Sequence, residues 1–483
     1  MARSLGWRRS PPVAGDVAAP QGAAQDWIRA NLTPAGFWLA ALVTIVFALP
    51  GPIDRALFAV NLGREVDATP GAIFSITDLL LIGTVAFASP QLLRRWRTAR
   101  WTEHAPIIAL FATVVVLAFI SLAQAAGHIP SDQLGAGIKG AVIFVRMGLI
   151  FLCVTLIVRS PIDLRGLAIG LVLATGGLLA NGLLFTYQHR AVLDRLTAGT
   201  FGNDLYANLL AVIALLLAGF VIVLWSSRLI RLVAAAATLA CVAAIAGTGT
   251  RTAAIVFIVG LGGLAALLHS VKGVMTANKR RWFLLLIAAF FVSQLYAVLL
   301  LRSSALLGLL LGQALHPSHV RAVPEVASRL AIWGGTLRMV HDHLWLGVGP
   351  GQWDFFRHAY GVNFIEFLDA HNAYLNILAD DGVFVLVGYL SIIGVSLWRG
   401  LRTLQRLLAA TQRRAGPLID AALLGILAVG IAAWLVTDFA NSGALNLRAQ
   451  IFYWLMLALF YRAPEIFLSD STAAEIGGHR RKT

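Results

Sequence analysis

Residues 140–158, "GAVIFVRMGLIFLCVTLIV", form one long apolar run in which Arg146 is the single charge. A helix of about 20 apolar residues crosses the hydrocarbon core of a bilayer. Runs of this kind recur along the chain of 483 residues, which is 59% hydrophobic and 13% charged, with a mean hydropathy of +0.79. No soluble domain of this size needs so much apolar material, so the composition predicts an all-α integral membrane protein.

Apolar runs of sufficient length predict about 12 transmembrane helices. The predicted spans are 36–50, 72–89, 106–124, 139–158, 164–186, 205–225, 229–247, 251–268, 282–301, 382–398, 418–440 and 447–462. Residues 1–35 then form a disordered cytoplasmic tail, 36–301 hold spans 1–9, 302–381 form one long outer loop, 382–462 hold spans 10–12, and 463–483 form a second cytoplasmic tail.

The basic residues set the expected orientation of these spans. The formal net charge is +15, but lysine and arginine occur in short clusters between apolar runs, as in "RRWRTAR" at 94–100 and "KRR" at 279–281. Clusters of this kind mark cytoplasmic loops and are not a basic groove for nucleic acid. Both termini are therefore expected in the cytoplasm, with the long loop 302–381 on the outer face.

A charged side chain such as that of Arg146 has an unfavourable free energy inside a membrane unless it has a partner or faces water. Asp78 lies at a similar depth in its own predicted span, so one interpretation is a structural ion pair between the two residues. The other interpretation is that Arg146 faces an outward-open cavity and binds an anionic lipid head group. The sequence leaves both open.

Arg251 follows "AGTGT" and opens a predicted span on the outer face. A helix N-terminus offers unpaired backbone N–H groups and a positive dipole end, which bind anions, and an arginine there adds a bidentate clamp. The alternative is an arginine that merely reaches the membrane interface. We favour anion binding, because a cation at a helix N-terminus is disfavoured unless an anion offsets it.

The outer loop contains a predicted amphipathic helix, "SRLAIWGGTLRMVHDH", with Ser328 as its candidate N-cap. No metal site is predicted there, because His341 and His343 are two residues apart, whereas helical ligand pairs want a spacing of three or four. The chain also has no Asp-x-Asp to hold a divalent ion under a diphosphate. Any phosphate chemistry must then depend on arginines.

His371 lies in "DAHNAYLNILADDG", residues 369–382, just before a late apolar run. Asn372 or Asp369 can cap a helix that starts at about 373, and Asp369 is close enough in sequence to orient the histidine. The positive helix end favours a neutral imidazole, which can accept a proton. A lone histidine at a helix entry is usually structural, so its neighbours decide the interpretation.

These segments resemble the O-antigen ligase and O-antigen polymerase superfamily of bacterial inner-membrane glycosyltransferases. The resemblance lies in "SRLAIWGGTLRMVHDHLWLGVGPGQW", "HNAYLNILADDGVFVLVGYL", "FGNDLYANLLAVIALL" and "GTGTRTAAIVFIVGL", and it covers about 200–398. Two positions depart from the family pattern, which usually has proline at Leu344 and serine at Thr250.

The resemblance implies transfer of a glycan from undecaprenyl diphosphate to a hydroxyl acceptor at the periplasmic face, with inversion and without a metal or other cofactor. Catalytic roles then fall on His371 as general base and on Arg251 and Arg329 at the diphosphate. The residues that we expect to bind substrate are Arg146, Trp333, Asn372 and Asp369.

The implied partners are the undecaprenyl-diphosphate-linked glycan, a lipid A core or glycan acceptor, and membrane lipids, with no nucleic acid. An O-antigen ligase-like enzyme is the first hypothesis. An O-antigen or exopolysaccharide polymerase and a protein-glycosylating relative are alternatives within the superfamily. A small-solute transporter is the alternative of another class, although the candidate residues crowd the outer third of the membrane.

Overall fold

The computed structural model describes most of the hydrophobic part of the chain. The described residues are 33–48, 101–131, 133–188, 202–223, 228–248, 250–271, 276–310, 322–363, 369–413, 418–441 and 447–468, with isolated positions between 82 and 97. The predicted span 72–89 and residues 1–32 of the predicted N-terminal tail therefore lie essentially outside this part.

All regular structure in these ranges is helical, which confirms the predicted fold class. The helices are α2 (Pro34–Ala48), α5 (Trp101–Ala125), α6 (Leu134–Ile157), η1 (Pro161–Asp163), α7 (Leu164–Gln188), α8 (Gly202–Val223), α9 (Arg228–Thr248), α10 (Arg251–Ser270), α11 (Ala277–Leu310), α12 (Ala322–Asp342), α13 (Trp353–Phe356), η3 (Arg357–Tyr360), α14 (Ala373–Arg413), α15 (Leu418–Ala440), α16 (Leu447–Tyr461) and α17 (Ala463–Phe467).

Eight described helices are long and apolar enough to cross a membrane, and two shorter apolar helices cover Pro34–Phe47 and Ala449–Tyr461. The chain is thus a multi-pass membrane protein, while the count of 12 spans stays a prediction. Every predicted span that lies within the described residues coincides with a helix. The region predicted as the second tail begins with α17, in which Phe467 is buried.

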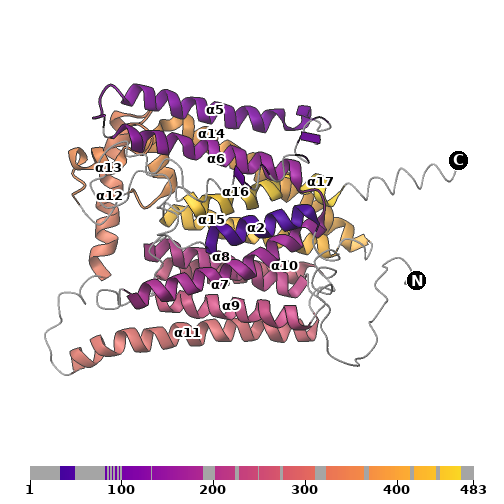
Figure 1. Ribbon diagram of the computed structural model, residues 1–483. Coiled ribbons are helices and arrows are strands. Elements are labelled where there is room, and N and C mark those ends of the chain that lie inside the picture. The colour runs from indigo at the N-terminus through magenta and orange to yellow at the C-terminus, as the bar shows by residue number, and fades with distance from the viewer. Residues whose placement is uncertain are drawn as a thin grey trace.

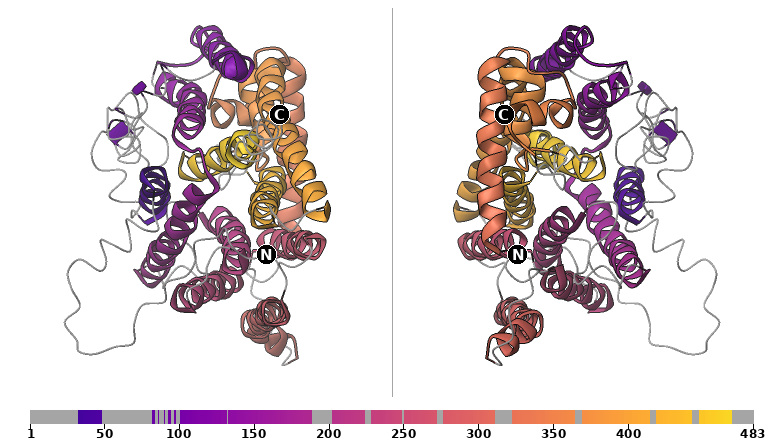
Figure 2. Two further views of the ribbon diagram at one scale, coloured as in Figure 1. Left: turned by 90° about the vertical axis from the view of Figure 1, so that its right-hand side faces the viewer. Right: turned by 90° about the vertical axis from the view of Figure 1, so that its left-hand side faces the viewer.

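The long helices run side by side, and α12 and α13 lie at one end of the bundle (Figure 1). Figure 2 shows the bundle helices nearly end-on, with α12 crossing them. The other end, where α17 lies, gathers arginines: Arg399 donates to the carbonyl oxygen of Tyr461, and the charges of Arg159 and Arg399 act on Arg462.

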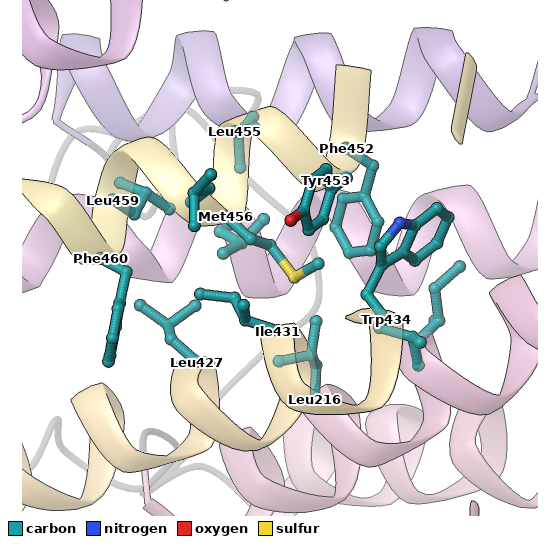
Figure 3. Close-up of a cluster of buried hydrophobic side chains, with 14 of the residues drawn as sticks. Leu216, Leu427, Ile431, Trp434, Phe452, Tyr453, Leu455, Met456, Leu459 and Phe460 are labelled. Carbon is teal, nitrogen blue, oxygen red and sulfur yellow. The ribbon is translucent and has the colours of Figure 1, made fainter. Parts of the chain in front are cut away.

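The core of the bundle lies where α15 and α16 meet α8 (Figure 3). Trp434 and Tyr453 stack with ring centroids 5.9 Å apart, and Trp454 packs edge-on against Phe111 at 5.5 Å. Nearly every residue of α8 is buried, as Leu216 is. A helix that is apolar on all sides is buried in protein or in lipid, and α8 is buried mostly in protein.

The helices and turns between α11 and α14 form a cap with a small core of its own. The buried members of that core are Ile332, Met339, Val340, Val348, Trp353, Val362, Ala370 and Ala379. The predicted N-cap at Ser328 is wrong, because α12 begins at Ala322. Pro324 does not prevent this earlier start, since the N–H groups of a first helical turn have no intrahelical partner.

The start of the tenth predicted span, residue 382, coincides with a break inside α14. Gly382 has φ 83° and ψ 177°, so one helix ends before it and a second begins after it. Residues 344–351, the glycine turn, lie against the break with their backbone. Gly349 N–H donates to the carbonyl of Asp380 at 2.8 Å, and Val383 N–H donates to the carbonyl of Leu344 at 2.9 Å. The break thus locks the cap to α14.

Replacing Gly382 with alanine is expected to lower the melting temperature of the purified protein. Alanine strains a positive φ, and its Cβ would lie 2.3 Å from the carbonyl oxygen of Trp345, so the cost is at least about 1–3 kcal/mol. Gly394 in the same helix is the control, because a Cβ there meets nothing within 4 Å. Gly394→Ala should be neutral or slightly stabilising, and equal melting temperatures for the two variants would contradict the prediction.

Candidate functional site

Asp204, in the first turn of α8, connects two of the predicted site elements. Its carboxylate lies 3.3 Å from the guanidinium Nη2 of Arg329 in α12, and it accepts a hydrogen bond of 3.2 Å from the hydroxyl of Thr250. Thr250 is the residue before Arg251. Arg329 and the start of α10 are therefore brought together around one carboxylate.

Arg251 is the first residue of α10, as the sequence analysis predicted. Thr250 occupies the N-cap position, but its side chain does not cap the helix, because its hydroxyl is turned to Asp204. The N–H groups at this helix end thus receive no cap from Thr250, and the side chain of Arg251 is exposed beside them. A helix end with these features is suited to an anion.

His371 has φ 48°, and it is the only non-glycine residue with positive φ in the described part of the chain. Asp369 stabilises this conformation, because its Oδ1 accepts the backbone N–H of His371 at 2.7 Å. The same oxygen lies 3.2 Å from Nδ1 of the imidazole, a distance that makes an ion pair only when the ring is protonated. Strained backbone of this kind is found preferentially at functional sites.

Trp333 holds the His371 segment against α12. Its indole Nε1–H donates to the carbonyl of Ala370 at 3.0 Å, and its ring lies edge-on to Phe439 at the end of α15, with centroids 6.0 Å apart. Trp333 is four residues after Arg329, so both side chains lie on the same face of α12. The histidine segment and Arg329 are therefore neighbours along that face.

Asn372 caps α14, since its Oδ1 accepts the N–H of Leu375 at 2.9 Å. Of the two predicted caps, Asn372 and Asp369, the first therefore caps the helix, while the second holds the turn before it. Asn376 adds a further constraint, because its Oδ1 accepts the N–H of Ala370 at 3.0 Å.

Asp380 is a buried carboxylate that joins α14 to the glycine turn, and the sequence analysis gave it no role. Its Oδ1 accepts the backbone N–H of Trp353 at 2.7 Å, and its Oδ2 accepts a hydrogen bond from Asn376 at 2.7 Å. The spacing of four residues between Asn376 and Asp380 on one helix was the available signal. Through Asn376 this network reaches the backbone next to His371.

The structure thus brings Arg251, Arg329, Trp333, Asp369, His371 and Asn372 to the same end of the bundle. Arg146 is not among them. It is buried twelve residues into α6, about 18 Å along that helix from its first residue. Its predicted partner Asp78 lies outside the described residues, so the role of Arg146 stays a prediction. Asp204, like Asp380, was not predicted from the sequence.

A separate polar group lies on the surface of the cap. His341 Nδ1 is 3.0 Å from Asp342, and this hydrogen bond lowers the pKa of the Asp342 carboxyl, while burial raises the pKa of the neighbouring Tyr360. Within the described ranges, no three His, Cys, Asp or Glu side chains are grouped so that they could hold a metal ion.

Residues 235–390 match the O-antigen ligase family. The matched range contains Arg251, Arg329 and His371, and it ends inside α14. Over this part, the chain is therefore similar to the O-antigen ligase family. The match supports a glycosyltransferase-like role in polysaccharide biosynthesis over the transporter alternative. Asp204 and Arg146 lie outside the matched range.

A curated relative supports the same superfamily. The chain is similar to the teichuronic acid biosynthesis protein TuaE of Bacillus subtilis (strain 168), with 26% identity over 155 residues. This match covers 32% of the chain and 29% of the relative, so the chain spans less than a third of the relative's length.

Proposed function

We propose that the protein is a glycosyltransferase that moves a glycan from undecaprenyl diphosphate to a hydroxyl acceptor at the end of the bundle that carries α12. The observation that carries the proposal is the convergence around Asp204. Its carboxylate contacts Arg329 and Thr250, next to Arg251, while Trp333 ties the His371 segment to the helix of Arg329. A base and two cations at a lipid-accessible surface are what this chemistry needs.

Arg251 and Arg329 are proposed to bind the donor diphosphate. A guanidinium has five N–H donors in a planar fork, so the contact of Arg329 with Asp204 fixes its direction and leaves the fork able to take phosphate oxygens. At Arg251 the N-terminus of α10 adds backbone N–H groups to the clamp. The two arginines then stabilise the negative charge that develops as the diphosphate leaves.

Asp204 is proposed to position Arg329 while the site is empty of donor. Its side chain is 40% exposed and that of Arg329 is 28% exposed, so the pair is screened by solvent and contributes only about 0.2–1 kcal/mol to stability. The contact is therefore weak enough to rearrange when a diphosphate with greater charge competes for the guanidinium.

His371 is proposed to act as general base on the acceptor hydroxyl. Nδ1 is buried near Asp369 while 20% of the side chain is exposed, so Nε2 is the proposed proton acceptor. As the hydroxyl oxygen bonds to the anomeric carbon, its proton passes to Nε2. The bond from the anomeric carbon to phosphate breaks, and its electron pair stays on the diphosphate.

Attack from the face opposite the leaving diphosphate inverts the configuration of the anomeric carbon. The proposal requires no cofactor, because Arg251 and Arg329 supply the positive charge. Asn372 and Trp333 would border the bound glycan, since both lie beside His371. Chelation of divalent ions is accordingly expected to leave the rate of transfer unchanged.

The acceptor is proposed to be a sugar of the lipid A core, as in a ligase. The alternative is a polymerase that extends a second lipid-linked glycan, and the name of the similar relative, a teichuronic acid biosynthesis protein, favours such a role in polysaccharide synthesis. Deleting the gene and separating the lipopolysaccharide on a gel distinguishes the two. Loss of all O-antigen from the core identifies a ligase, and core that carries a single repeat identifies a polymerase.

The end of the bundle that carries α12 is expected to face the periplasm of the inner membrane, with both termini in the cytoplasm. Cysteine placed at the exposed His341 should react with an impermeant thiol reagent in intact spheroplasts. Cysteine at the exposed Arg406, on the second half of α14, should react only after lysis. Native Cys153 and Cys241 are buried and give little background. The reverse labelling pattern would contradict the orientation.

A further inference from the structure

An apolar groove lies on the bundle where α8, α9 and α11 meet, far from the site around Asp204. It has a volume of about 280 Å³, and its lining is almost entirely apolar, with Ile222, Leu239, Trp282, Leu286 and Ala289 among the residues that form it. Ala218, the lining residue of α8 nearest to the site, is 14 residues after Asp204, so about 21 Å of helix separates the groove from the site.

The groove exists because α11 packs mainly on one neighbour. Figure 1 shows α11 at the edge of the bundle with α9 beside it, and α11 makes substantial contact with α9 alone among the described helices. The side of α11 that faces α8 therefore leaves space between helices. In a membrane, hydrocarbon chains fill space of this kind.

The depth of the groove matches one leaflet of a bilayer. Its lining residues on α11 run from Trp282 to Ala289, a separation of seven residues, which corresponds to about 11 Å along the helix. Half of a hydrocarbon core is about 15 Å thick. The groove is thus suited to the acyl chains of a phospholipid from the leaflet opposite the site.

Two cations lie one helical turn before the groove lining, since Arg231 is four residues before Ala235 in α9 and Lys279 is three residues before Trp282 in α11. Arg231 is three residues into α9 and Lys279 two residues into α11, so both precede the apolar lining on their helices. Burial and, next, the charge of Arg231 lower the pKa of Lys279. Like charges held together at a membrane surface favour an anion between them.

We infer that this groove binds an anionic phospholipid, with its acyl chains between α8, α9 and α11 and its phosphate between Arg231 and Lys279. The site is distinct from the proposed donor site, because its cations and the Arg251–Arg329 pair lie at opposite ends of the bundle. A polyprenyl donor held by its diphosphate near Asp204 would place its charge at the other membrane face.

Trp282 provides a direct probe, because it lines the groove and is 45% exposed. The full chain in detergent micelles is titrated with brominated phosphatidylglycerol or brominated phosphatidylcholine, whose bromine atoms quench nearby tryptophan. Trp282→Phe supplies the background from the other tryptophans. The difference between the wild type and Trp282→Phe is the fluorescence of Trp282. We expect brominated phosphatidylglycerol to quench this fluorescence at a lower mole fraction than brominated phosphatidylcholine does.

Charge removal tests the head-group contact. Lys279→Gln and Arg231→Gln should each raise the half-quenching mole fraction of phosphatidylglycerol roughly fivefold, since a basic residue near the surface contributes about 1 kcal/mol toward anionic lipid. Arg406→Gln, at the same end of the bundle on α14, should leave it unchanged. Ala289→Leu fills the groove without a change of charge, so it should abolish the quenching of Trp282 fluorescence by both lipids.

Three results would overturn the inference. These are equal quenching of Trp282 by the two lipids, equal effects of Lys279→Gln and Arg406→Gln, and displacement of the brominated phosphatidylglycerol by undecaprenyl phosphate. The last result would assign the groove to the glycan carrier. All variants are checked for the wild-type elution volume on size exclusion, so that a folding defect is not mistaken for a loss of lipid.

Discussion

Replacing His371 with alanine is expected to lower the rate of glycan transfer by about 10²–10⁴, the usual contribution of a general base. The assay uses purified protein, an undecaprenyl-diphosphate-linked glycan and a core or glycan acceptor. Binding of the donor should be retained, because the proposed diphosphate contacts come from Arg251 and Arg329. Loss of transfer with retained donor binding places His371 at the chemical step.

The positive φ of His371 requires a second variant, since alanine disfavours that conformation. Asparagine adopts it readily but is not a base, so His371→Asn should fold like the wild type and be as inactive as His371→Ala. His341→Ala, at an exposed histidine of the cap, is the matched control and should retain full activity. Wild-type transfer by His371→Asn would return this histidine to a structural role.

Replacing Arg251 or Arg329 with lysine is expected to lower kcat/KM by about 10²–10³, the typical cost of one lost charge-stabilising donor. Lysine keeps the charge but has no planar fork, so it cannot bind a phosphate through two parallel hydrogen bonds. Arg338→Lys is the control, because Arg338 lies on the same helix as Arg329 and is exposed, with its guanidinium on the carbonyl of Tyr360.

Full activity in Arg251→Lys and Arg329→Lys would show that a positive charge alone suffices at these positions. Asp204→Asn separates positioning from binding, because it keeps the shape of the side chain and removes its charge. It should raise KM for the donor more than it lowers kcat if Asp204 mainly sets the direction of Arg329. An unchanged KM would remove Asp204 from the proposal.

The sequence by itself determined the fold class and the approximate positions of the apolar helices. The free energy of placing a segment in the membrane is a sum over its residues. A run such as 140–158 therefore predicts a membrane helix whichever helices surround it. The starts of α10 at Arg251 and of α14 at Ala373 were also predictable, because helix-entry signals are local. The start of α12 was not, since Ser328 is a good cap in isolation but lies inside a longer helix.

The tertiary structure alone decided which charged residues meet. Asp204 and Arg329 are 125 residues apart, and nothing in the short segment around Asp204 distinguishes it from an acidic residue that merely suits a helix N-terminus. Likewise, the left-handed backbone of His371 depends on Asp369, and the Trp333 bond to Ala370 joins segments 37 residues apart. Hydrogen bonds and ion pairs need specific atoms at specific distances, and only the packing of the helices sets those distances.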